Sequence, residues 1–204
     1  MSLDIASRLT ALEDCADVIA GLSVAGRLEH DPAGTHQVVT TRHLTEGVPY
    51  EYEAAHRLRI VPGRATESYE LHEGDVLFMS RGTRNRAWAV ASVPNPTIAP
   101  VSFYILRPSD GLDGGYLAWY LNQAPAQATI AKIRTGAGTP LVQRDAFKEL
   151  EVVLPPIAVQ REIAVLGGLL ARERSLRQRL SEASERAHSA LGTNIIATLR
   201  DHHA

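Results

Sequence analysis

Short apolar runs, each bounded by glycine, proline or polar residues, predict most of the strands in this chain. Runs rich in β-branched and aromatic residues predict strands at 38–41, 58–60, 71–80, 87–91, 101–108 and 150–154. Between two of these strands lies a polar loop, residues 81–86, that carries three arginines. The strands follow one another without a helix after each, so they do not form βαβ units.

Helical patterns occupy the remaining parts of the chain. Residues 114–133 predict a helix that Pro125 divides in two, because proline cannot continue a helix interior. Residues 135–139 predict a glycine turn. Helically spaced apolar residues also predict a short helix within 1–20. The fold class expected is α+β, a mixed or antiparallel twisted sheet with flanking helices, followed by a long C-terminal helix of the coiled-coil type.

A proline pair, Pro155-Pro156, separates the last predicted strand from the longest predicted helix. Proline tolerates a strand end or the first turn of a helix, so the pair predicts a boundary between residues 1–154 and residues 155–204. Heptad spacing beyond it predicts an apolar seam formed by Leu166, Leu169, Leu176, Leu180, Ala183, Ala187 and Ala190.

Two arrangements of this helix fit its pattern. An amphipathic helix commonly packs on its own domain. About 30 residues of helix would nevertheless span about 45 Å, which is longer than a domain of this size can cover. We therefore expect a projecting helix that pairs with another helix, and Gly167-Gly168 is a candidate bend. Glu173 and Asn194 on the seam could fix the register of such a pair.

Composition narrows the class of protein. The chain has 204 residues, and no apolar run reaches the roughly 20 residues of a membrane span. Its single cysteine, Cys15, excludes an internal disulfide and a four-cysteine zinc site. The first residues lack the pattern of a secretory signal, so a cytoplasmic location without membrane contact is expected.

Arginine on loops is the feature that points to a ligand. The net charge is −2, but of 21 basic residues only Lys132 and Lys148 are lysines. Arginine and asparagine on loops suit phosphate contacts and base-edge readout. The candidates for contact with double-stranded DNA are Arg42, Arg81, Arg84, Asn85, Arg86, Lys132, Arg134 and Arg144. The alternative is a set of unrelated solvated loops.

Catalytic motifs are missing from the sequence. No phosphate-binding loop, HExxH or CxxC occurs, and neither lysine closes the Glu-x-Lys or Asp-x-Lys triplet expected of a magnesium-dependent nuclease. We therefore expect a protein that is not an enzyme and has no metal or cofactor.

Five motifs in order resemble the DNA specificity subunit of Type I restriction-modification systems, in its target-recognition domain. They are Leu-x-Asp-x-Ala-Asp-Val-Ile-x-Gly (12–21), Leu-x-x-Gly-Asp-Val-Leu-Phe (71–78), Gly-Tyr-Leu-x-x-Tyr-Leu-Asn (115–122), Ile-x-x-Gly-x-Gly-Thr (133–139) and Leu-Pro-Pro-x-x-x-Gln-x-x-Ile-Ala (154–164). The last motif is the most specific. Members of this family typically carry two such domains and two antiparallel helices, whereas this sequence has one of each.

The resemblance implies an adaptor that reads DNA. The domain would read one half of a bipartite site, the helix would act as a spacer, and a methyltransferase subunit would bind around them. Whether a nuclease or translocase subunit joins them is left open. A homodimer formed through the helix would read a palindromic interrupted site. Two other functions remain as alternatives, a helix-mediated dimeric scaffold or adaptor without DNA reading and, ranked last, a small nuclease.

Overall fold

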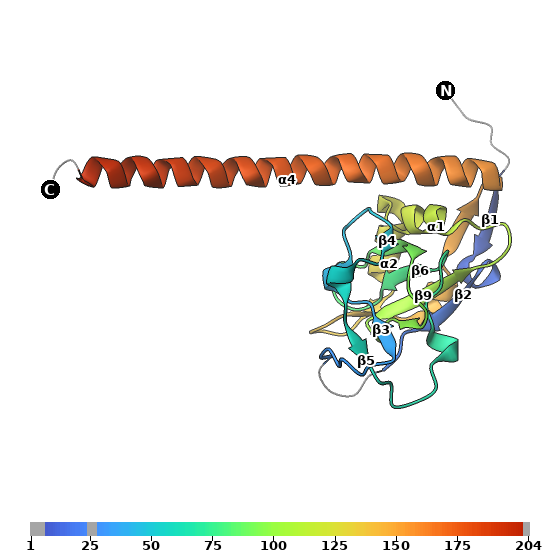
Figure 1. The fold of residues 1–204 in the computed structure, drawn as a ribbon. Coiled ribbons are helices and arrows are strands. Elements are labelled where there is room, and N and C mark those ends of the chain that lie inside the picture. The colour runs from blue at the N-terminus through green and yellow to red at the C-terminus, as the bar shows by residue number, and fades with distance from the viewer. Residues whose placement is uncertain (1–6, 24–27, 202–204) are drawn as a thin grey trace, which may run out of the picture.

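A computed structural model describes residues 7–23 and 28–201. The chain folds into an α+β domain followed by one long helix, α4, as predicted (Figure 1). The strands are β1 (Arg8–Ala11), β2 (Ala16–Ala20), β3 (His36–Val38), β4 (Tyr50–Glu51), β5 (Arg59–Ile60), β6 (Val76–Met79), β7 (Ala87–Ser92), β8 (Thr97–Ile98), β9 (Phe103–Pro108), β10 (Arg134–Thr135), β11 (Leu141–Val142) and β12 (Glu151–Leu154). The α-helices are α1 (Gly114–Leu121), α2 (Ala124–Lys132), α3 (Arg144–Lys148) and α4 (Ile157–Asp201), and short 3₁₀ turns are η1 (Leu12–Asp14), η2 (Thr41–His43), η3 (Ala54–His56) and η4 (Glu67–Tyr69).

A five-stranded sheet in the order β2-β9-β6-β7-β4 forms the centre of the domain. Its strands pair antiparallel except β4, which runs parallel to β7. Phe78 and Leu106 alternate along β6 and β9 with Leu77 and Ile105, and the two sets belong to different apolar clusters. Because side chains alternate across a strand, each face of this sheet covers its own core.

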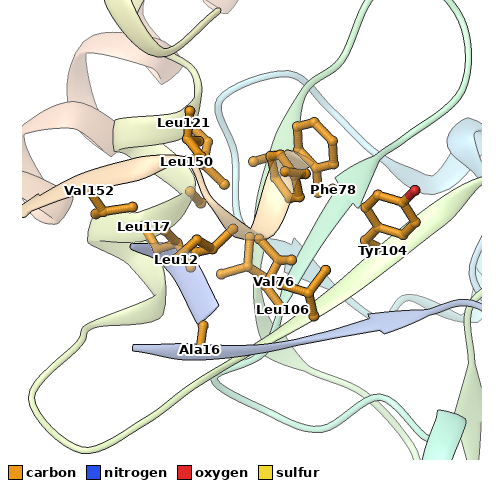
Figure 2. Close-up of a cluster of buried hydrophobic side chains, with 14 of the residues drawn as sticks. Leu12, Ala16, Val76, Phe78, Tyr104, Leu106, Leu117, Leu121, Leu150 and Val152 are labelled. Atoms are coloured by element: carbon orange, nitrogen blue, oxygen red, sulfur yellow. The ribbon is translucent and has the colours of Figure 1, made fainter. Parts of the chain in front are cut away.

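The larger core joins segments that are far apart in sequence. Figure 2 shows Leu12 and Ala16 from the N-terminal segment converging with Leu117 and Val152 on the central sheet. Phe78 stacks on Phe147 at a centroid distance of 4.3 Å, which ties α3 to the same core. A second sheet, β5-β3-β8, carries its own small cluster beside the first sheet.

The predicted N-terminal helix is wrong. Residues 8–20 form β1, η1 and β2, and β1 pairs antiparallel with β12 while β2 pairs with β9. Leu9, Leu12 and Ala16 do have helical spacing, but strand partners from the far end of the domain supply the hydrogen bonds instead. Long-range pairing therefore overrides the local pattern.

The joint after β12 is held by the glutamine of the proline-pair motif. Gln160 is 1% exposed, and its side-chain oxygen accepts a hydrogen bond from the Asp113 backbone N–H at 2.9 Å. Its amide nitrogen donates to the carbonyls of Gly111 and Pro155 at 2.9 and 2.8 Å. The first turn of α4 is thereby fixed to the start of α1, and the direction in which the long helix leaves the domain is set.

Helix α4 is 45 residues long, or about 68 Å at 1.5 Å per residue. It runs past the domain and projects beyond it (Figure 1). Packing along its whole length on its own domain, the alternative left open by the sequence, is therefore excluded. The helix continues through Gly167 and Gly168 without the expected bend.

Candidate nucleic-acid interface

Two loops that are 50 residues apart in sequence form one edge of the domain. The β6–β7 loop, residues 81–86, and the β10–β11 hairpin, residues 134–142, are joined by an antiparallel bridge between Arg81 and Leu141. The Gly82 N–H donates to the Pro140 carbonyl at 2.7 Å. The Arg134 guanidinium donates to the Thr83 carbonyl at 2.8 Å. We call these two segments the paired loops, and their contacts make them a single unit.

Positive charge gathers on and beside the paired loops. Arg81, Arg84 and Arg144 are exposed, and Arg134 is half-buried. Burial raises the pKa of the Tyr104 phenol, while the nearby guanidiniums of Arg144 and Arg81 act in the opposite direction. The Tyr104 hydroxyl donates to the Val142 carbonyl at 2.7 Å, so it lies under the hairpin. Arg81 and Arg144 are therefore close to one buried point beneath the paired loops.

The remaining predicted basic residues have other surroundings. Lys132 is exposed at the end of α2, next to the hairpin in sequence. Arg86 forms an ion pair with Glu46 at 3.0 Å, so part of its charge is already neutralised. Arg42 lies in η2, outside the paired loops. Arg81, Arg84 and Arg134 thus lie in the paired loops, and Arg144 lies beside them at the start of α3, whereas Arg42 lies elsewhere.

Asn85 requires a correction, because its side chain cannot reach a base edge. It is 2% exposed, and its amide donates to the Met79 carbonyl at 2.9 Å across the base of the loop. Asparagine suits readout only when its amide faces the groove. In this domain the amide instead closes the β6–β7 loop from inside.

Two side chains from the helices hold the same loop, and the sequence did not single them out. Asn122 accepts from the Ala87 N–H at 3.1 Å and donates to the Ala87 carbonyl at 2.8 Å. Gln127 donates to the Asn85 and Leu121 carbonyls at 2.7 and 2.6 Å. Asn122 ends the Gly-Tyr-Leu-x-x-Tyr-Leu-Asn motif, which is the one signal that could have drawn attention to it. The helix pair therefore fixes where the arginines of the loop are presented.

A histidine pair occupies a different part of the domain. The rings of His43 and His56 stack with centroids 4.8 Å apart. The Nδ1 atom of His43 accepts from the Thr40 N–H at 3.2 Å, and that of His56 accepts from the Glu53 N–H at 3.3 Å. Burial, followed by the nearby His56 and Arg42, lowers the pKa of His43. An accepting Nδ1 requires the neutral ring, so the pair acts as two caps for 3₁₀ turns.

Within residues 7–23 and 28–201, no group of three or more histidine, cysteine or acidic side chains could hold a metal ion. No helix in the described ranges is both long enough and apolar enough to cross a membrane.

The apolar seam of α4 is exposed to solvent. Its leucines Leu166, Leu169, Leu176 and Leu180 are 53–72% exposed, and Ala183, Ala187 and Ala190 are exposed as well. The face toward the domain carries small residues, Ala164, Gly167 and Ala171. At 100° per residue these two faces lie on roughly opposite sides of the helix. A second helix on the seam would therefore not compete with the domain for α4.

Comparison with solved structures identifies the fold. The chain is similar to the HsdS subunit from Thermoanaerobacter tengcongensis, with a TM-score of 0.60 and 17% identity over 88% of this chain and 41% of that one. It is also similar to a chain of the type I R-M system solved for its complex assembly and conformational transition, with a TM-score of 0.66 and 16% identity over 94% of this chain and 45% of that one. A third similarity is to the Type I restriction-modification S subunit from M. genitalium, with a TM-score of 0.54 and 13% identity over 81% of this chain and 39% of that one.

At these identities the likeness concerns the fold, and this fold is the one that the sequence motifs predicted. No protein-family model matches the chain. No curated protein matches it either. The chain spans less than half the length of the solved subunits that it resembles.

Proposed function

We propose that this chain is a sequence-specific DNA-binding specificity subunit of a Type I restriction-modification system, without catalytic activity of its own. The domain reads one half of a bipartite site through the paired loops. Helix α4 sets the distance to the second half, and a methyltransferase subunit binds around this framework. The fold shared with the solved specificity subunits supports the proposal at the level of the whole domain.

The observation that carries the proposal is the paired loops. Arg81, Arg84 and Arg144 project from, or lie beside, segments whose backbones are hydrogen-bonded to each other and to the helices. A guanidinium on a fixed backbone can make a bidentate contact to phosphate or guanine without first losing loop entropy. A loop that is merely solvated would need none of these hydrogen bonds.

The exposed seam supports pairing of α4 with another helix, and a second copy of this chain is the partner proposed. Two identical domains would then be related by a two-fold axis. Such a dimer reads a palindromic site interrupted by a spacer, because half-site spacing mirrors the symmetry of the protein.

The net charge of −2 predicts weak DNA binding by the chain alone and stronger binding with its methyltransferase subunit. Co-expression followed by native purification tests the partnership, and methylation of a defined DNA by the complex tests the reading. Failure of the methyltransferase subunit to co-purify would contradict the proposal.

The salt dependence of DNA binding tests the arginines of the paired loops. Replacing Arg81, Arg84 or Arg144 with alanine should flatten the slope of log K against log salt by about 0.9 for each phosphate that the side chain neutralises. Arg161→Ala is the matched control, because this arginine is exposed on α4 and away from the paired loops. Titrations of labelled DNA at several salt concentrations measure both quantities.

The same titrations distinguish DNA reading from the alternative function, a scaffold. A helix-mediated scaffold that does not read DNA is favoured by the length and exposure of α4 alone. In that case the complex would keep its assembly, and its DNA binding would be indifferent to all four substitutions.

A further inference from the structure

Three arginines follow one another along α4 at intervals of one heptad. Arg172, Arg179 and Arg186 all occupy the g position of the frame in which Leu166 is a, and all three are exposed. We call these three residues the arginine row. At 1.5 Å per residue its members are about 10.5 Å apart, and the row is about 21 Å long. It begins directly after Ala171, which lies against Gly47 of the domain, and continues along the helix as it leaves the domain (Figure 1).

The arginine row lies on a flank of α4 between the seam and the domain. At 100° per residue its mean direction is roughly 75° from the seam and roughly 90° from the face that packs on the domain. On the opposite flank, Arg177 forms an ion pair with Glu173. Among the described residues, no carboxylate lies within ion-pair distance of the three guanidiniums of the row. Glu182 is one turn from two of them, but its carboxylate instead accepts from Gln178 at 3.0 Å.

Pairing of α4 with a second copy would not neutralise the row. In paired helices the e and g positions carry the salt bridges between chains. A parallel copy would place its e positions opposite the row, and these are Leu170, Arg177 and Ser184. An antiparallel copy would place its own arginine row there. Neither set contains a carboxylate, so in both orientations the row stays available to a negatively charged partner.

Duplex DNA has the charge and the dimensions to bind this row. Each strand carries one phosphate for every 3.4 Å of the duplex axis, so the interval between two arginines corresponds to about three base pairs and the whole row to about six. Six base pairs are slightly more than half a turn of the duplex, over which the phosphates of one strand face the same side. A guanidinium can bind each phosphate through two parallel hydrogen bonds.

A groove of about 730 Å³ lies between the arginine row and the base of the paired loops. Arg179 borders it from α4, and Arg86, the last residue of the β6–β7 loop, borders it from the domain. The two carboxylates in its lining are engaged within the protein, Glu46 with Arg86 and Glu182 with Gln178. The row and the paired loops are therefore on the same side of α4, and one duplex can contact both.

We infer that the arginine row binds the phosphate backbone of the DNA spacer between the two half-sites. The inference rests on the proposed function, in which α4 and the spacer extend across the same gap between the two domains. It adds a contact that does not depend on base sequence. The helix then holds the spacer DNA as well as separating the domains.

A matched pair of arginines tests the contact. Arg179→Ala and Arg177→Ala each remove one positive charge from an exposed position of α4, two residues apart and on opposite flanks. The probe is a duplex carrying the site that the methyltransferase complex modifies in a random plasmid library. Arg179→Ala should flatten the slope of log K against log salt by about 0.9, and replacement of the whole row by about 2.7, whereas Arg177→Ala should leave it unchanged. Equal slopes in the two single variants would overturn the inference.

Neutral methylphosphonates locate the contact on the DNA. When they replace the spacer phosphates, binding by the wild-type complex should weaken severalfold, because the row loses the charges that it binds. The variant with alanine throughout the row should lose nothing further. The same replacements outside the two half-sites are the control and should affect both proteins equally. An equal loss in wild type and variant on the spacer DNA would contradict the inference.

Two further readouts separate this inference from the proposed function. A wild-type complex that binds DNA with and without the half-sites equally contradicts the proposed function. A complex that prefers its half-sites, with a salt slope indifferent to the row, contradicts only the spacer contact. Sedimentation equilibrium should show the same assembly for the wild type and for the alanine variant. Loss of the dimer or of the methyltransferase subunit in that variant would mean that the row binds protein, and it would overturn the inference.

Discussion

Two glycines, Gly47 and Gly167, allow α4 to approach its domain closely. A Cβ atom on Gly167 would lie 2.2 Å from the Trp119 ring, and one on Gly47, which has a φ of +75°, would lie 2.2 Å from the Ala171 Cβ. Each separation is far below van der Waals contact, so these two glycines are required for close packing and not for flexibility. Gly168, in contrast, has open space around it.

Gly167→Ala should therefore destabilise the protein by about 1–3 kcal/mol, because the half-buried Trp119 ring must move. Gly168→Ala is the control at the next residue, and it should stabilise the helix by up to about 1 kcal/mol, since alanine has the higher helix propensity. Urea unfolding followed by circular dichroism measures both. Equal effects of the two substitutions would show that helix propensity, and not the contact with Trp119, decides the outcome at Gly167.

The histidine pair predicts a pH dependence of stability. The pKa of His43 is lowered from its ordinary value of 6.5, chiefly by burial, so the folded state binds fewer protons than the unfolded state at mildly acidic pH. Stability is then fully present above about pH 6.5 and declines as the pH falls through that value. Protonation would also place a hydrogen on the Nδ1 atom that accepts from Thr40.

His43→Gln should reduce this decline, although it costs some stability at neutral pH through loss of the stack on His56. The measurement is the free energy of unfolding between pH 5 and pH 8. A variant that loses stability as steeply as the wild type below pH 6.5 would exclude His43 as the cause.

At the scale of elements, a helix pair positions a loop. Asn122 and Gln127 contact the base of the β6–β7 loop by hydrogen bonds to its backbone, and Asn85 closes it from inside. Each bond contributes about 0.5–1.5 kcal/mol, so together they can outweigh the entropy of ordering several loop residues. The arginines of the loop are exposed, but the side-chain amides of Asn85, Asn122 and Gln127 fix the backbone that carries them.

Gln127→Ala should therefore weaken DNA binding by the complex without changing the salt slope, because every phosphate keeps its arginine. Amide hydrogen exchange in residues 81–86 should become faster at the same time. Thr129→Ala on the same helix is the control, since its exposed hydroxyl donates to the Pro125 carbonyl within α2 and not to the loop. A slope flattened by about 0.9 would instead mean that Gln127 touches DNA.

How far the elements could be predicted from sequence depends on where their partners lie. The strands β6, β7 and β9 and the division of α1 from α2 at Pro125 follow from local patterns, and all were predicted. Residues 8–20 were assigned to a helix, because nothing near them reveals that β12 and β9 supply their partners. The two-residue strands β4 and β8 are too short to carry a pattern.

The same reason limits the prediction of the candidate site. Arg81, Arg84, Arg134 and Arg144 could be selected by residue type, and the structure places them together. Asn85 was selected with them, but it is buried, and Gln127 of α2, about 40 residues further along, donates a hydrogen bond to its backbone carbonyl. Residue type predicts which side chains could contact a ligand, whereas the tertiary fold decides which of them remain exposed.

At the scale of the whole molecule, the length of α4 would set the distance between two domains joined through paired helices. The domain is fixed to the start of the helix by Gln160, so in an antiparallel pair the separation of the two domains grows with the length of the paired helices. The helix rises about 1.5 Å per residue, and duplex DNA rises about 3.4 Å per base pair. A change in helix length should therefore appear as a change in the spacing of half-sites.

Duplication of residues 177–183 in α4 adds one heptad and keeps the seam in phase. The two domains should move apart by about 10.5 Å, which corresponds to about three base pairs of spacer. Methylation by the reconstituted complex on a series of DNAs with different spacers measures the shift. A four-residue insertion at the same point is the control, because it breaks the heptad phase and should weaken the dimer. An unchanged spacer preference in the seven-residue variant, with the dimer intact, would show that α4 holds the two copies together without setting the distance between the half-sites.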